Sequence, residues 1–91
     1  MNVVLDGRGM TDRKVVHDEL KKQLMLPDYY GRNLDALFDV LTERREPMTV
    51  TVTYWTDMEV QLGAYAAALL DTLYDAEREN PNLKIVVKRE S

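Results

Sequence analysis

Residues 26–41, LPDYYGRNLDALFDVL, combine a turn, a helix start and a charged helix face. Proline, two tyrosines and a glycine predict a turn. Asn33 is a suitable N-cap for the helix that follows, because its side-chain oxygen can accept a hydrogen bond from a free amide of the first turn. With an advance of about 100° per residue, Leu34, Leu37 and Leu41 share one face, which we expect to pack against a core.

The other side of this helix carries Asp35 and Asp39, four residues apart, together with Phe38 and Thr42. Like charges at this spacing repel each other. Asp35 suits the positive end of the helix dipole, whereas Asp39 has no such compensation. A solvated acidic face with a half-buried phenylalanine is one interpretation. A protein-binding surface is the other, because aromatic anchors beside charges are typical of binding hot spots, and Tyr29 is near.

The motif of residues 26–39 resembles the barstar family, the intracellular inhibitors of secreted barnase-type ribonucleases. Gly7 after a short apolar strand, His17, and the Leu-Lys-Lys of residues 20–22 also match, and the resemblance covers nearly the whole chain. It implies a single barstar-like domain over residues 1–91. It also implies an inhibitor and not an enzyme, with a helix that plugs the ribonuclease active site and acids that stand in for RNA phosphates.

The resemblance also implies which residues contact the partner. The turn and the helix would supply Tyr29, Tyr30, Gly31, Asn33, Asp35, Phe38, Asp39 and Thr42. Peripheral acids of the family match Glu46 and, after a one-residue shift, Asp75 and Glu79. Asp71, Asp75 and Glu79 repeat every four residues, so a solvated ridge is the alternative for that helix.

Three positions depart from the family pattern. The best-known member has tryptophan where Phe38 and Arg44 stand, and an acid where Arg32 stands. Together with Arg45, the new arginines place positive charge beside the acidic face, which weakens attraction to the strongly basic cleft of barnase. A different ribonuclease is one interpretation, and a barstar-fold interaction module with a non-ribonuclease partner is the alternative.

Composition limits the other possibilities. The chain has 91 residues, a formal net charge of -4 and 45% hydrophobic residues, which predicts one folded domain. Bases such as Arg13, Lys14 and Lys21 are interspersed with acids, so we expect no nucleic-acid partner. No signal-peptide pattern or apolar run of ~20 residues is present, so we expect a cytoplasmic protein without membrane contact. We also expect a monomer.

An enzymatic interpretation of the acids is also open. Asp35 and Asp39 could act as an acid–base pair or bind a hard cation such as magnesium, but the remaining ligands would have to come from Asp75 or Glu79. The single histidine, His17, has no serine partner before the last residue, and cysteine is absent. The prediction is therefore no catalytic residue, no metal and no cofactor.

The order of elements predicts the fold class. Strands separated by helices indicate right-handed crossovers, and so an α/β domain with a three-stranded parallel sheet and about four helices. A threonine row alternates with apolar residues in the second strand, so we expect helices on mainly one face of the sheet. Thr11 or Asp12 caps the first helix, and Thr56 to Glu59 form a capping box for the third. The expected strands are 3–5, 48–54 and 83–88, and the expected helices follow residues 12, 33, 56 and 63.

Overall fold

The computed structural model describes residues 1–91 and contains one parallel sheet of three strands in the order β1-β2-β3. Four α-helices connect or flank these strands, which confirms the predicted α/β architecture. In chain order the elements are β1 (Asn2–Asp6), the 3-10 helix η1 (Gly7–Gly9), α1 (Arg13–Leu24), α2 (Leu34–Glu43), β2 (Met48–Thr53), α3 (Trp55–Leu62), α4 (Ala64–Glu79) and β3 (Leu83–Val87).

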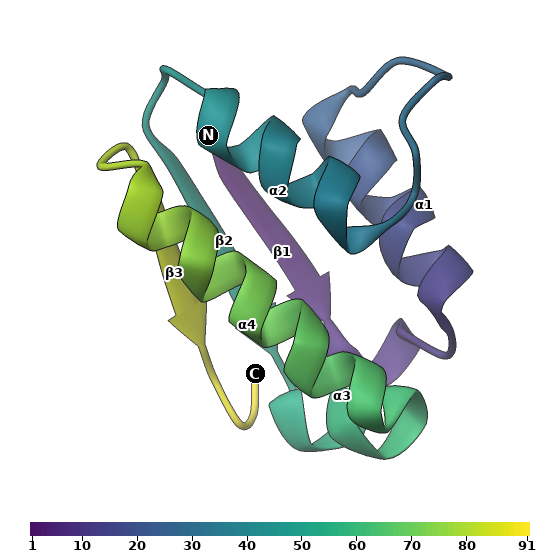
Figure 1. Cartoon of the computed structure of the whole chain (residues 1–91). Coiled ribbons are helices and arrows are strands. Elements are labelled where there is room, and N and C mark those ends of the chain that lie inside the picture. Colours follow the sequence, from purple (N-terminus) through teal and green to yellow (C-terminus); the bar gives the residue numbers. More distant parts are fainter.

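Helices cover one face of the sheet, as the threonine row predicted. α1, α2 and α4 lie in front of the strands in Figure 1. Along β2, Met48, Val50 and Val52 are buried, while the threonines between them are only half-buried. Val4 of β1, on the open face, remains 48% exposed. The core therefore lies between one face of the sheet and the helices.

Side chains from the helices cover both edges of the sheet. Gln23 of α1 accepts from the Val4 amide at 2.9 Å and donates to the Val4 carbonyl at 2.7 Å. At the other edge, Glu77 of α4 accepts from the Ile85 amide at 2.7 Å. Val4 and Ile85 are the middle residues of β1 and β3. A helix side chain is therefore hydrogen-bonded to the backbone at the centre of each edge strand.

The first helix is capped by Asp12 and not by Thr11, the other predicted candidate. The Asp12 carboxylate accepts from the Val15 amide at 3.0 Å. The helix ends at Met25, which adopts a left-handed conformation with φ 53°, two residues before Pro27. No helix of the chain combines the length and the apolar character needed to cross a bilayer.

The predicted capping box at the start of α3 is wrong. The helix begins at Trp55, and its N-cap is Tyr54 with φ 52° and no side-chain cap, so Thr56 lies within the first turn. The backbone of Gly7 packs closely against this start, because a Cβ atom on Gly7 would lie 2.1 Å from the Tyr54 carbonyl oxygen. The Trp55 amide also donates to the Lys88 carbonyl at 3.1 Å. Close contacts between the strand ends thus replace the side-chain cap.

Candidate functional site

The segment before α2 is joined to the helix by Asn33. Its side-chain oxygen accepts from the Ala36 amide at 2.8 Å, which confirms the predicted N-cap. Its side-chain nitrogen donates to the Gly31 carbonyl at 3.1 Å, and a Cβ atom on Gly31 would lie only 3.0 Å from that nitrogen. Arg32 between them has φ 49°, a left-handed conformation that costs a non-glycine residue about 1–2 kcal/mol. One side chain therefore fixes both the turn and the helix start.

Tyr30 lies inside the molecule, although it was predicted to contact a partner. It is 6% exposed, and its hydroxyl lies 2.7 Å from Nδ1 of His17. The other ring nitrogen of His17 lies 2.7 Å from the hydroxyl of Tyr65 on α4. A buried hydroxyl needs a partner, and His17 provides one. His17 is itself 1% exposed and not the boundary residue that its helix position predicted.

Tyr30, His17 and Tyr65 form a Tyr-His-Tyr bridge, and burial keeps it neutral. Burial lowers the pKa of His17, raises the pKa of Tyr30 to about 12, and raises the pKa of Tyr65. A neutral imidazole donates with one nitrogen and accepts with the other, and each tyrosine hydroxyl can take the complementary role. The bridge therefore ties α1, the turn and α4 together without a buried charge.

The far end of α2 is held by Asn80, the residue after α4. Its side-chain nitrogen donates to the Leu41 carbonyl at 2.8 Å and to the Arg44 carbonyl at 2.9 Å. Asn82 donates to the Arg45 carbonyl at 2.9 Å. Carbonyls at a helix C-terminus have no partner within the helix, so Asn80 supplies what the helix lacks. Both ends of α2 are thus attached to the rest of the fold.

The exposed surface of this segment is narrower than the predicted one. Asp35 and Asp39 are exposed, and Tyr29 is 88% exposed. Phe38, expected to face outward between the acids, is half-buried and packs against the core. The Thr42 hydroxyl donates to the Phe38 carbonyl at 2.8 Å and so bonds to its own helix.

The sequence interpretation missed one acid of this surface, which is Glu43. It is exposed and continues the spacing of Asp35 and Asp39 to the end of α2. The three carboxylates form the α2 acidic stripe. No lysine or arginine lies within ion-pair distance of any of them. The stripe therefore offers unpaired negative charge to solvent or to a partner.

The peripheral acids predicted to contact a partner are all exposed, but they differ in their surroundings. Asp75 forms an ion pair with Arg78 on the same helix. Glu79 and Glu46 make no ion pair, and Glu46 lies in the loop between α2 and β2. α2 and α4 run side by side in Figure 1, so their acids flank one region of the surface.

Comparison with known proteins decides the family. Residues 1–88 match the family model described as Barstar (barnase inhibitor). A relative from Bacillus subtilis (strain 168), named "Putative ribonuclease inhibitor YrdF", is 39% identical over 88 residues, which cover 94% of this chain and 97% of the relative. The chain belongs to the barstar family. The predicted resemblance is thereby confirmed over the whole domain.

The structure gives this barstar-family chain no cluster for metal chemistry. No group of three or more histidine, aspartate or glutamate side chains lies close enough to hold a metal ion. The metal interpretation needed Asp75 or Glu79 to complete a shell around Asp35 and Asp39, and the fold does not bring those groups together. The acids therefore remain separate charges on a surface.

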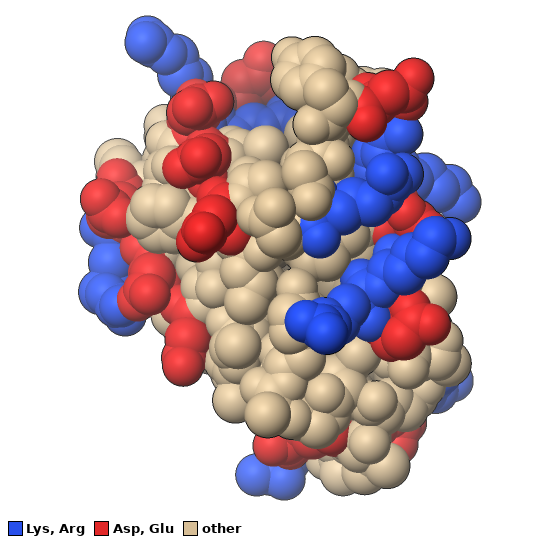
Figure 2. Space-filling model, turned by 45° about the vertical axis from the view of Figure 1, so that its right-hand side comes forward, with Lys and Arg blue, Asp and Glu red and all other residues tan.

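A second feature of the barstar-family chain was also missed, because its residues are scattered in the sequence. Arg13, Lys14 and Arg32 gather around one hollow beside the start of α2. Figure 2 shows mainly acidic side chains along one side of this face, basic side chains with acidic ones among them on the other, and uncharged surface between them. The face therefore has an acidic region and, beside it, a region of mixed charge that contains most of its cations.

Proposed function

We propose that this chain inhibits a barnase-type ribonuclease by covering its active site with the α2 acidic stripe and the Tyr29 turn. Ribonucleases bind the phosphates of RNA with basic groups, and Asp35 and Asp39 present carboxylates at a spacing fixed by one helix turn. Charge complementarity of this kind accelerates association and selects the partner. In this proposal the chain binds without chemistry of its own, and its cytoplasmic location protects the cell that makes the ribonuclease.

The proposal rests on one observation: the acids of α2 have no cation partner, and the backbone of α2 is fixed at both ends. Asp35 and Asp39 have no cation partner within the chain, although like charges at this spacing repel each other. The helix that carries them is fixed by Asn33 at its start and by Asn80 at its end. A surface that is already ordered loses less entropy on binding, which favours high affinity.

Tyr29 supplies the second element of the proposed surface. It is 88% exposed, while Tyr30 beside it is buried and bonded to His17. The buried tyrosine anchors the turn, and the exposed one projects from it. An exposed tyrosine on a fixed turn suits a hot spot, because a rigid aromatic ring buries a large area at small entropic cost.

The test is an inhibition titration against a panel of barnase-type ribonucleases, including any from the same cell. The wild-type chain is expected to suppress the activity of at least one enzyme at an equimolar ratio. The Asp35→Asn/Asp39→Asn variant keeps the shape of the side chains and should lose that inhibition. An Asp71→Asn/Glu59→Gln variant, at one exposed acid of α4 and one of α3, removes the same charge and serves as the matched control. Full inhibition by the α2 variant would contradict the proposal.

A further outcome concerns the partner class. If no ribonuclease of the panel is inhibited, the same chain can be used to capture proteins from its own cell. A captured protein that is not a ribonuclease, and whose binding depends on Tyr29 and Asp39, would favour an interaction module of the barstar fold. Arg32, which stands where the best-known member has an acid, is the sequence feature that raises this alternative.

A further inference from the structure

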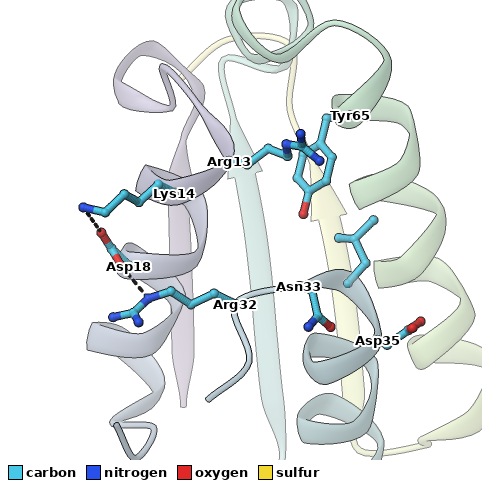
Figure 3. A pocket seen from close by; sticks show the side chains of 8 residues that line it. Arg13, Lys14, Asp18, Arg32, Asn33, Asp35 and Tyr65 are labelled. Atoms are coloured by element: carbon cyan, nitrogen blue, oxygen red, sulfur yellow. Dashed lines mark hydrogen bonds and ion pairs between the residues drawn. The ribbon is translucent and has the colours of Figure 1, made fainter. Parts of the chain in front are cut away.

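The hollow adjoins the start of α2, and Asp35 of the acidic stripe forms part of its lining. It has a volume of about 690 Å³ and opens between the first turns of α1, α2 and α4. Figure 3 shows Lys14 and Arg32 directed toward Asp18 on one side, Arg13 directed the other way over the Tyr65 ring, and Asp35 on the far rim. The three cations come from the first turn of α1 and from the turn before α2, which the rest of α1 separates in the sequence.

The charges around the hollow do not cancel. The lining contains two acids, Asp18 and Asp35, and Asp18 lies close to two of the cations, with Lys14 Nζ at 3.4 Å and Arg32 Nε at 2.9 Å from its carboxylate oxygens. Partial burial acts to raise the pKa of Asp18, but the hydrogen bond from Arg32 and the charge of Lys14 outweigh it and lower that pKa. Asp18 is therefore ionised at neutral pH. Two carboxylates against three cations leave an excess of one positive charge in the lining of the hollow.

The donors that remain free point to a planar anionic group. Arg13 forms no ion pair and no side-chain hydrogen bond, and its guanidinium lies 5.1 Å from the Tyr65 ring centre. Arg32 uses only Nε, so its two terminal nitrogens are also free. The fork of a guanidinium matches a carboxylate in a bidentate arrangement. The Tyr65 ring holds Arg13 in place for such a contact.

The hollow shares residues with the surface proposed for the inhibitor. Asn33 and Asp35 line it, and both are part of that surface. A ribonuclease that covers Asp35 therefore also covers the rim of the hollow. A polyanion such as RNA fits less well, because the chain has a formal net charge of -4 and the acidic stripe lies alongside.

We propose that the hollow receives a carboxylate side chain of the ribonuclease, held by the guanidinium of Arg13. This inference rests on the proposed function and adds to it the chemistry of the partner. The partner carries an acid beside its basic active site, placed so that both regions of the chain are matched at once. A barnase-type enzyme without that acid is bound less tightly.

The test uses Arg13→Gln against a ribonuclease that the wild-type chain inhibits. The substitution removes one cation, so the sign of its effect on the dissociation constant depends on whether the partner surface that faces Arg13 is acidic or basic. If the partner presents an acid, the dissociation constant rises roughly five- to twenty-fold and association slows. If the partner is basic throughout, removal of a like charge leaves binding unchanged or tightens it. Arg13→Lys, which keeps the charge but not the fork, is expected to lie between wild type and Arg13→Gln.

Lys84→Gln is the matched control for net charge. Lys84 is exposed between the buried Leu83 and Ile85, so its side chain lies on the open face of the sheet, away from the helices. It should change the dissociation constant less than two-fold. Thermal unfolding of each variant, followed by circular dichroism, checks that the loss of the Arg13–Tyr65 contact does not disturb the fold.

The outcomes separate this inference from the proposed function. Inhibition by the wild type with equal or tighter binding by Arg13→Gln overturns the inference and leaves the proposed function intact. Failure of the wild type to inhibit any enzyme of the panel overturns both. A titration with inorganic phosphate that shifts the NMR resonances of Arg13 and Arg32, together with undiminished inhibition by Arg13→Gln, would assign the hollow to a small anion and overturn the inference.

Discussion

Two helices of this chain carry acids at four-residue spacing, and the structure treats them differently. On α2 the acids have no cation partner, and Asn33 and Asn80 fix the two ends of the helix. On α4 one of the three acids, Asp75, is paired with Arg78. Spacing alone therefore does not distinguish a binding surface from a solvated ridge. None of the α2 acids is paired, which supports the proposal that α2 is the main binding surface.

The largest expected effect would divide the two helices most clearly. Asp39→Ala should weaken ribonuclease binding by about 2–5 kcal/mol, because it leaves basic groups of the partner buried without a counter-charge. Asp71→Ala, on the ridge of α4, should change binding by less than about 0.5 kcal/mol. Inhibition titrations of both variants measure the difference. Equal losses would remove the distinction between the helices.

The second prediction concerns the attachment of α2. Asn80→Ala leaves the carbonyls of Leu41 and Arg44 without their donor, and the free energy of unfolding should fall by about 1–3 kcal/mol. Urea unfolding measures this loss. Asn82→Ala removes one exposed hydrogen bond, to Arg45, and is the matched control with a smaller loss. If Asn80→Ala also slows association, the held helix end matters for binding as well as for stability.

The third prediction tests the attachment of the turn through pH. Burial lowers the pKa of His17, so the unfolded chain, with a pKa near the usual value of about 6.5, takes up the proton first. Stability is therefore complete above about pH 6.5 and falls as the pH drops below it, by at most about 1.4 kcal/mol per pH unit. Urea unfolding between pH 7.5 and 5.5 measures the slope.

His17→Gln is the control for this slope. It removes the titrating group, so the dependence of stability on pH in this window should flatten. The carboxylates whose pKa is lowered, Asp6, Asp18 and Asp28, lose their contribution only at lower pH, as the pH falls below about 4. A slope that persists in His17→Gln would place its origin outside the bridge.

The smallest expected effect is on the association rate and comes from two of the peripheral acids, Asp75 and Glu79. Glu79→Gln should reduce the association rate about two- to three-fold at low salt, with little change in the dissociation rate. Asp75→Asn should have a smaller effect, because Arg78 already balances that charge. Stopped-flow measurements at two salt concentrations compare them. A larger effect at Asp75 than at Glu79 would mean that the ion pair opens on binding.

The sequence predicted what depends on local pattern. The alternation along β2 identified the one-sided sheet, and Asn33 identified the start of α2, because a strand face and an N-cap are set by neighbouring residues. The capping box at Thr56 failed because contacts between strand ends, around Gly7 and Tyr54, determine where α3 begins. Local pattern could not include those contacts.

The candidate site was predictable only in part for the same reason. Tyr29 and Tyr30 are adjacent and alike, and only the distant His17 makes one of them internal. The cations of the hollow are 19 positions apart at most, from Arg13 to Arg32, and the fold of the turn brings them around it. The sequence alone gave no reason to group them.

The covered edges of the sheet limit how this chain can meet other molecules. Gln23 and Glu77 occupy the central peptide groups of β1 and β3, where an incoming peptide would otherwise add a fourth strand. Recognition by backbone pairing, which is tolerant of sequence, is thereby blocked at the middle of both edges. Recognition of a binding partner through side-chain contacts on the helical face is favoured instead. The fold itself therefore favours binding that depends on the sequence of the partner, whichever residues make the contacts.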